Sequence, residues 1–220
     1  MASVQIFPSL ISADLLNLRA ELNRYDSLVD GYHIDVMDFH YVPNLTIGPD
    51  FINELRKATS LPFMVHLMVQ YPERCMERFE LQKGDIVSIH PESISDVSIT
   101  CLIEKCQKKG WVPSLAFNPE TSLSLITDLV IVPQHILLMA VNPGFSGQKM
   151  LPSIYHKLTE LEDLKIKGNY DFITAVDGGI NLSNAMRLKE QGANQLVLGS
   201  ALFSSPNPLN MLQDLRNLLD

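Results

Sequence analysis

The segment Tyr32-His33-Ile34-Asp35-Val36-Met37 is a short, mostly apolar run of the kind that forms a buried strand. Seven further runs of this kind recur along the chain, separated by stretches with helical spacing and polar faces. The predicted strands are Gln5–Leu10, Tyr32–Met37, Pro62–Met68, Asp85–His90, Val112–Phe117, His135–Val141, Phe172–Asp177 and Gln195–Gly199. Eight strands that alternate with helices indicate closure into a barrel rather than an open sheet.

The stretches between the strands predict amphipathic helices at Leu15–Leu28, Pro72–Gln82, Val97–Lys109, Leu151–Lys167 and Leu182–Gln191. Asn181 can cap the last of these, while Gly110 and Gly192 stand where helix C-termini would end. The competing doubly wound sheet normally carries a Gly-x-Gly-x-x-Gly turn or a phosphate-binding Gly-x4-Gly-Lys loop, and the sequence has neither. No linker or low-complexity segment interrupts the alternation, so we expect residues 1–220 to form a single (β/α)8 barrel domain.

Charge and hydropathy argue against two classes of partner. Seventeen basic against 25 acidic residues give a net charge of −8, the wrong sign for binding nucleic acid. No apolar run approaches the ~18 residues that a membrane span requires. The N-terminal segment Met1–Gln5 lacks the features of a secretory or transit signal, and three cysteines without Cys-x-x-Cys spacing are expected as reduced thiols. We therefore expect a cytoplasmic protein that binds neither nucleic acid nor membrane.

Four polar side chains fall near the C-terminal ends of predicted strands, where barrels of this kind place their active sites. His33 and Asp35 are two residues apart and share one face of their strand, His66 lies near the end of the third, and Asp177 closes the seventh. Each alone has a structural explanation as a buried histidine or a cap. Together, two imidazoles and two carboxylates predict a mixed nitrogen and oxygen site for one divalent metal ion, namely Zn, Fe, Mn or Co.

Glycine turns follow three consecutive predicted strands. They are Asn142–Gln148 after the sixth, Asp177-Gly178-Gly179 at the end of the seventh and Gly199-Ser200 at the end of the eighth, just before a predicted helix start. Glycine lets backbone N–H groups approach a phosphate closely, and barrels often bind phosphate with the loops after strands seven and eight. These turns predict a phosphate site.

Six motifs make the sequence resemble the ribulose-phosphate 3-epimerase family from about residue 6 to residue 203. They are Pro8–Asp14, His33–Asp38, Val42–Asn44, His66–Val69, Val141–Phe145 with Gly147–Lys149, and Val176–Asn181. The resemblance implies a TIM barrel of the ribulose-phosphate-binding type. It also implies an isomerase of the pentose phosphate pathway that interconverts D-ribulose 5-phosphate and D-xylulose 5-phosphate at C3, with a ketose phosphate as its small-molecule partner and a homo-oligomer left open.

The resemblance also implies residue roles. His33, Asp35, His66 and Asp177 would hold the metal, and Asp35 and Asp177 would double as the catalytic acid/base pair. The substrate would be contacted by Ser9, His66, Met37, Met68, Met139, Gly144, Phe145, Ser146, Gly147, Gly178, Gly179, Gly199 and Ser200. The chemistry fits, because removing a C3 proton next to a carbonyl gives an enediolate, and returning a proton to the opposite face requires a second acid.

Three alternatives remain open at this point. His90-Pro91-Glu92 and Asn118-Pro119-Glu120 look somewhat like the related allulose-6-phosphate 3-epimerases, which act on a hexulose phosphate. A sugar-phosphate decarboxylase of the same fold would carry Asp-x-Lys-x-x-Asp on strand three, but Pro62–Met68 contains neither lysine nor aspartate. The third alternative is a non-catalytic homologue. The presence of all four metal-site residues argues against it, because binding alone would not need them.

Phe39 stands where the family usually has glycine, directly after Asp35-Val36-Met37-Asp38. Glycine can adopt backbone conformations that cost other residues roughly 1–2 kcal/mol. The loop therefore either takes a different path or places Phe39 under strain. The added ring either packs against a neighbour or reshapes the substrate mouth.

Overall fold

The computed structural model describes residues 3–94 and 98–220, in which eight parallel strands form one sheet. The strands are β1 (Gln5–Pro8), β2 (Tyr32–Met37), β3 (Phe63–Met68), β4 (Ile86–Ile89), β5 (Val112–Phe117), β6 (His135–Met139), β7 (Ile173–Asp177) and β8 (Gln195–Leu198). Each strand from β2 to β7 pairs with the next one along the chain, and β1 pairs with β8. A parallel bridge between Ser9, directly after β1, and His33, near the start of β2, closes the ring. The predicted barrel is confirmed, with strand ends within two residues of those expected.

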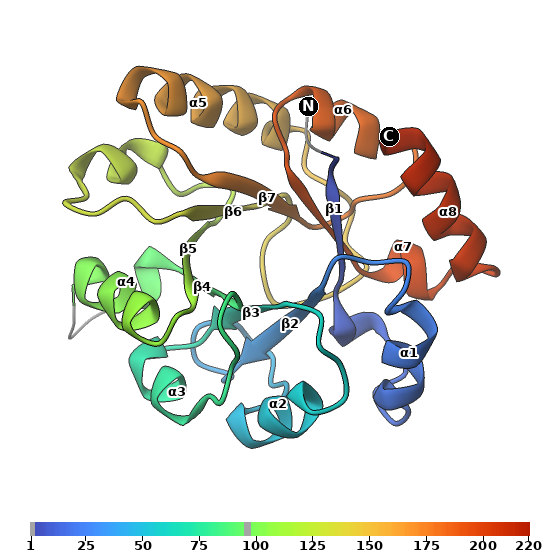
Figure 1. The fold of residues 1–220 in the computed structure, drawn as a ribbon. Coiled ribbons are helices and arrows are strands. Elements are labelled where there is room, and N and C mark those ends of the chain that lie inside the picture. The colour runs from blue at the N-terminus through green and yellow to red at the C-terminus, as the bar shows by residue number, and fades with distance from the viewer. Residues whose placement is uncertain (1–2, 95–97) are drawn as a thin grey trace.

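The helices lie around the outside of the strand ring (Figure 1). They are α1 (Leu18–Tyr25), α2 (Pro49–Arg56), α3 (Pro72–Arg78), α4 (Ile99–Lys108), α5 (Ser153–Gly168), α6 (Ala185–Glu190), α7 (Ser200–Phe203) and α8 (Pro208–Leu219), with 3-10 turns η1 (Leu10–Ser12), η2 (Pro91–Ser93) and η3 (Leu123–Asp128). A 3-10 turn, η3, stands between β5 and β6. The helices α2 and α8 lie outside the predicted set. Two of the sequence predictions fall partly outside the described residues. They concern Met1 and Ala2 of the N-terminal segment and Val97 of the predicted helix Val97–Lys109.

Successive side chains along each strand point to opposite faces of the sheet, so the strands contribute to two separate buried layers. Outward-facing side chains such as Ile34 and Val36 join the large core between the sheet and the helices. Inward-facing side chains fill the barrel, and this second cluster comprises Phe7, Met64, Ile86, Ala116, Leu137, Met139, Val141, Ala175 and Val197. The interior of the barrel is therefore a packed core, which leaves room for a site only at its ends.

Two of the three predicted helix-end signals are confirmed. Gly110 and Gly192 follow α4 and α6 with φ of 76° and 97°, the left-handed conformation that glycine adopts without steric cost. The predicted cap at Asn181 is wrong, because α6 begins at Ala185 and Asn184 precedes it. The Asn181 Oδ1 atom instead accepts hydrogen bonds from the backbone and hydroxyl of Ser183, which close a separate turn before the helix.

A polar network joins β1, β5, β6 and β8, and only its member on β1 is exposed. The His135 ring nitrogens lie 2.7 Å from Ser114 Oγ and 2.8 Å from Gln195 Oε1, and Gln195 Nε2 donates to Gln5 Oε1 at 2.7 Å. Burial lowers the pKa of His135 to about 4, so its neutral ring is favoured. Because every ring nitrogen has a partner, this histidine has a structural explanation.

None of the helices among residues 3–94 and 98–220 is long and apolar enough to span a membrane.

Phe39 has a φ of 64°, so the loop after β2 keeps the backbone conformation that suits glycine and places the phenylalanine under strain. Its side chain is 66% exposed, so little packing offsets this cost. We expect Phe39→Gly to be more stable than Phe39→Ala by about 1 kcal/mol, because alanine retains the strain. Urea unfolding of the two variants measures the difference.

Leu45 provides the matched control, because it lies in the same loop, is 68% exposed and is not among the described residues with positive φ. There the order should reverse, with Leu45→Ala more stable than Leu45→Gly. If Phe39→Gly were instead the less stable of its pair, the assignment of strain to Phe39 would be wrong.

Candidate active site

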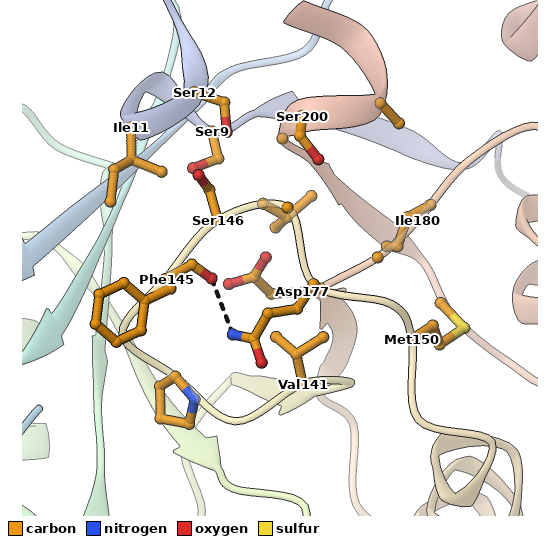
Figure 2. A pocket seen from close by; sticks show the side chains of 18 of the residues that line it. Ser9, Ile11, Ser12, Val141, Phe145, Ser146, Met150, Asp177, Ile180 and Ser200 are labelled. Carbon is orange, nitrogen blue, oxygen red and sulfur yellow. Dashed lines mark hydrogen bonds between the residues drawn. The ribbon is translucent and has the colours of Figure 1, made fainter. Parts of the chain in front are cut away.

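A cavity of about 600 Å³ opens at the C-terminal ends of the strands. Its walls come from the segments after β1, β6, β7 and β8, and Figure 2 shows Ser9, Ser146, Asp177 and Ser200 arranged around it. Asp35 lines it from the end of β2, together with the predicted methionines Met37, Met68 and Met139. The cavity therefore lies where a barrel of this kind places its chemistry.

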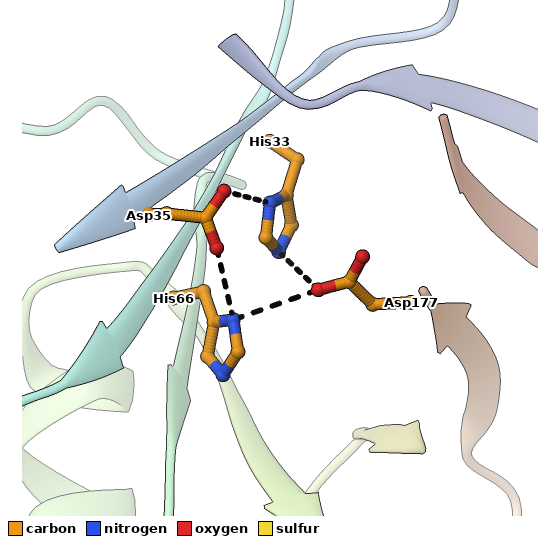
Figure 3. A group of neighbouring side chains, drawn as sticks. All are labelled: His33, Asp35, His66 and Asp177. Carbon is orange, nitrogen blue, oxygen red and sulfur yellow. Dashed lines mark hydrogen bonds and ion pairs between the residues drawn. The ribbon is translucent and has the colours of Figure 1, made fainter. Parts of the chain in front are cut away.

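Four side chains converge beside this cavity: His33 and Asp35 from β2, His66 from β3, and Asp177 from β7 (Figure 3). His33 Nδ1 lies 3.2 Å from Asp35 Oδ2, and His66 Nδ1 lies 3.4 Å from Asp35 Oδ1. Asp177 Oδ2 lies 3.8 Å from both His33 Nε2 and His66 Nδ1. One ligand atom from each residue falls within 4.8 Å of all the others. The structure thus brings together all four residues that the sequence singled out.

The donor set fits a metal ion, because two of its nitrogens are buried without a hydrogen-bond partner. His33 Nε2 and His66 Nδ1 are both in this position within the described part of the chain, and both face Asp177 Oδ2. A buried polar atom without a partner costs roughly 1–3 kcal/mol. A cation between the four side chains would satisfy both nitrogens and balance two buried carboxylates.

The two carboxylates have different surroundings. Burial alone would raise the pKa of Asp35, but the adjacent His33 and His66 rings lower it well below its usual range. Asp35 Oδ2 also accepts a 2.6 Å hydrogen bond from the Ser9 hydroxyl. Burial raises the pKa of Asp177, and the charge of Asp35 adds to that effect while His33 and His66 oppose it. The protein environment without a metal therefore distinguishes the two groups electrostatically.

The predicted glycine turns form one wall of the cavity. Gly178 and Gly179 have φ of 118° and 65°, and a Cβ atom on Gly179 would lie 2.3 Å from the backbone nitrogen of Met150. No other residue fits that position, so the turn after β7 packs directly on the segment after β6. Gly199 and Ser200, at the start of α7, line the same cavity.

The segment after β6 is held by two side chains. Asn44 Nδ2 donates to the Gly144 carbonyl at 2.7 Å, and Gln148 Nε2 donates to the carbonyls of Asn142 and Phe145. Figure 2 shows the bond to Phe145, whose ring is 57% exposed at the mouth.

Most of the predicted substrate-contacting residues line the cavity. His66 is the exception, because it is fully buried below the lining with its Nδ1 atom directed at Asp35 and Asp177. Ser12, Asn184 and Ser204 line the cavity but were not predicted. Ser12 Oγ is buried without a hydrogen-bond partner in the described residues, and its place within the motif Pro8–Asp14 was the available signal.

Solved structures share the fold. Orotidine 5'-monophosphate decarboxylase from Sulfolobus solfataricus is similar with a TM-score of 0.68 and 12% identity, over 98% of this chain and 97% of that one. A mutant tryptophan synthase alpha-subunit from Pyrococcus furiosus is similar with a TM-score of 0.65 and 14% identity, over 100% and 99%. At such identities the likeness shows the barrel alone.

Sequence comparison is more specific. The model of the ribulose-phosphate 3 epimerase family matches residues 5–203. The ribulose-phosphate 3-epimerase of Bacillus subtilis is 36% identical over 97% of this chain and 98% of its own length. The enzyme of the same name from Escherichia coli K12 is 36% identical over 100% and 97%. With the barrel and the four-residue cluster in place, these matches show that the chain belongs to the ribulose-phosphate 3-epimerase family of isomerases.

Proposed function

We propose that this protein interconverts D-ribulose 5-phosphate and D-xylulose 5-phosphate by moving a proton at C3, with a divalent metal ion bound by His33, Asp35, His66 and Asp177. The observation that carries the proposal is the placement of two carboxylates on different strands beside one cavity. Asp35 comes from β2 and Asp177 from β7, and both line the cavity. Epimerisation needs one group to take the proton from one face and another to return a proton to the opposite face.

Asp35 and Asp177 act as this pair and exchange their protonation states in each turnover. Ser9 orients Asp35 through its 2.6 Å hydrogen bond, and His33 Nδ1 lies 3.2 Å from the same Asp35 oxygen. A bound divalent cation supplies electrostatic stabilisation of the negative charge that develops on the enediolate oxygens. Zn, Fe, Mn and Co all suit the two imidazoles and two carboxylates.

The phosphate of the substrate binds at the wall of the cavity that the glycine turns form. Gly178, Gly179, Gly199 and Ser200 bring backbone N–H groups there, and the segment Gly144–Gly147 covers it. Local backbone dipoles are needed because the net charge of −8 does not attract an anion at long range. Met37, Met68 and Met139 limit the space around the reacting carbons.

We infer that residues 1–220 form one barrel domain, which acts in the cytoplasm on a small-molecule ketose phosphate without nucleic acid. The support for one domain is the single eight-stranded sheet that runs from Gln5 to Leu198.

A hexulose phosphate is the less favoured substrate, since the relatives reported above carry the ribulose-phosphate name. Phe39 does not change this preference, because its exposed ring is not among the described residues that line the cavity. We expect kcat/KM for D-ribulose 5-phosphate to exceed that for D-allulose 6-phosphate by at least about 10-fold, the scale on which one extra carbon is discriminated. Steady-state kinetics with both sugars measures the ratio.

The control is Phe39→Gly, which should leave that ratio within a factor of two. A wild-type preference for the hexulose phosphate would overturn the substrate assignment. A ratio that changes in Phe39→Gly would show instead that Phe39 takes part in specificity.

A further inference from the structure

His90 directly follows β4 and lies against the Nε2 atom of His66, and it is not among the described residues that line the cavity. Both rings are fully buried. Their Nε2 atoms are 2.8 Å apart, which is hydrogen-bond distance, and the ring centroids are 4.9 Å apart. The motif His90-Pro91-Glu92 has no role in the mechanism proposed above, so this contact needs its own explanation.

A hydrogen bond between two imidazole nitrogens contains one proton, so one ring donates and the other accepts. His66 Nδ1 faces Asp35 Oδ1 at 3.4 Å and Asp177 Oδ2 at 3.8 Å. For that nitrogen to bind a metal its lone pair must be free, which places the single proton of neutral His66 on Nε2. His90 Nε2 is then the acceptor, and the proton of His90 is on its Nδ1.

The outer side of His90 suits this arrangement. Its Nδ1 atom has no hydrogen-bond partner among the described residues and lies 3.9 Å from Glu92 Oε2, so an N–H there faces a carboxylate by charge rather than by a hydrogen bond. The other oxygen of Glu92 accepts hydrogen bonds from Asn118 Nδ2 at 3.4 Å and from Thr121. The Tyr41 ring packs on His90 with centroids 5.0 Å apart, and its hydroxyl accepts from Asn118 at 2.8 Å. His90 is thus held in place by groups that do not touch the cavity.

We propose that His90 is a positioning residue that fixes the tautomer and the orientation of His66, so that His66 Nδ1 presents its lone pair to the metal. The inference rests on the proposed metal site. A metal-binding histidine usually donates its second N–H to a carboxylate, a carbonyl or water. His33 has Asp35 Oδ2 beside its Nδ1 for this purpose, at 3.2 Å, whereas the hydrogen bond of His66 Nε2 is to His90.

The first test needs no substitution at His90. In metal-free wild-type protein labelled with 15N-histidine, two-dimensional NMR at alkaline pH reports which nitrogen of each neutral ring carries the proton. The His66 signals are identified by their loss in His66→Gln. We expect the proton on His66 Nε2 and on His90 Nδ1, and a proton on His66 Nδ1 would overturn the proposal.

The second test compares two replacements of His90 by their affinity for Zn²⁺, measured in competition with a chelating dye. His90→Phe keeps a planar ring beside Tyr41 but removes the acceptor, so we expect Zn²⁺ to bind about 10–100-fold more weakly. His90→Gln can place its amide oxygen where the Nε2 atom was, so its affinity should stay within about threefold of wild type. Equal affinities in wild type and His90→Phe would contradict the proposal.

His135→Gln is the matched control, because it replaces another fully buried histidine of the barrel that is bonded to Ser114 and Gln195 rather than to a proposed ligand. It should not change Zn²⁺ affinity. Wild-type protein that binds no Zn²⁺ at all would refute the metal site rather than the role of His90, for which the NMR result remains decisive. That result also decides the matter if His90→Phe does not fold.

Discussion

Asp177→Asn is expected to lower kcat for D-ribulose 5-phosphate by about 10²–10⁴-fold, the usual contribution of a positioned acid or base. This equals roughly 3–5 kcal/mol of transition-state stabilisation. Asp177 closes β7, is 15% exposed, and lines the cavity on the side opposite β2. An amide of the same size keeps the packing but cannot carry the proton. The fold should therefore stay intact by circular dichroism while turnover falls.

Asp177 is also a proposed metal ligand, so two readouts separate its roles. If the loss came only from weaker metal binding, excess Zn²⁺ would restore kcat, whereas loss of the proton carrier persists at saturating metal. In deuterated water the variant should still exchange the C3 hydrogen of one epimer, through Asp35, but not that of the other. Exchange from both epimers would show that the two-carboxylate mechanism is wrong.

Asp171→Asn provides the matched control. Asp171 lies just before Ile173, at the N-terminal end of β7, and is exposed. The same substitution there should therefore change kcat by less than a factor of two. A comparable loss in both variants would mean that the effect of Asp177→Asn is not specific to the site.

His66→Ala and Asp35→Asn are expected to largely abolish binding of one divalent ion per chain, with a loss of at least about 100-fold in affinity. His66 contributes one of the two buried nitrogens without a partner, and Asp35 lies beside both rings. Removing one ligand from a closed set of four loses both charge and geometry. Metal content after dialysis, with Zn²⁺ titration, measures the effect.

His156→Ala is the control, because this histidine is exposed on α5, outside the barrel. It should retain one equivalent of metal. Full metal occupancy in both His66→Ala and Asp35→Asn would remove these residues from the site.

The sequence predicted the barrel and the four-residue cluster because both follow from short-range rules. Alternation along β2 fixes the face of His33 and Asp35, and the position of Asp177 at the end of β7 follows from where the apolar run stops. Parallel strands then bring these positions to one end of the barrel.

The five named helices are present, and α2 and α8 were not among them for different reasons. Asn207, whose side chain accepts from the Asn210 backbone, and Pro208 signal the start of α8, and Leu212, Leu215 and Leu219 follow at helical spacing, so this helix could have been identified. By contrast, α2 has only eight residues and its N-cap Gly48 has no side chain to cap the helix, so Pro49 at the first position and Asp50 in the first turn were its available start signals. The helix cap was predicted at Asn181, three residues before the observed N-cap Asn184, because the Asn181 side chain accepts a hydrogen bond within a separate turn instead of capping α6.

Contacts between distant segments could not be predicted. His66 and His90 are 24 positions apart, and their 2.8 Å approach depends on the register of β3 against β4 and on the rotamers of both rings. Asn44 and Gly144 are 100 positions apart, and their hydrogen bond depends on the paths of two loops. No spacing in the sequence encodes either distance.

Hydrogen exchange at C3 tests the central claim most directly. Metal-loaded protein is incubated with D-ribulose 5-phosphate in deuterated water, and the products are followed by proton NMR before and after the metal is removed with a chelator. We predict that D-xylulose 5-phosphate forms with deuterium at C3, and that the reaction stops on chelation and returns when Zn²⁺ or Mn²⁺ is added back. Product that keeps its original C3 hydrogen, or turnover unaffected by removal of the metal, would contradict a metal-dependent proton transfer between Asp35 and Asp177.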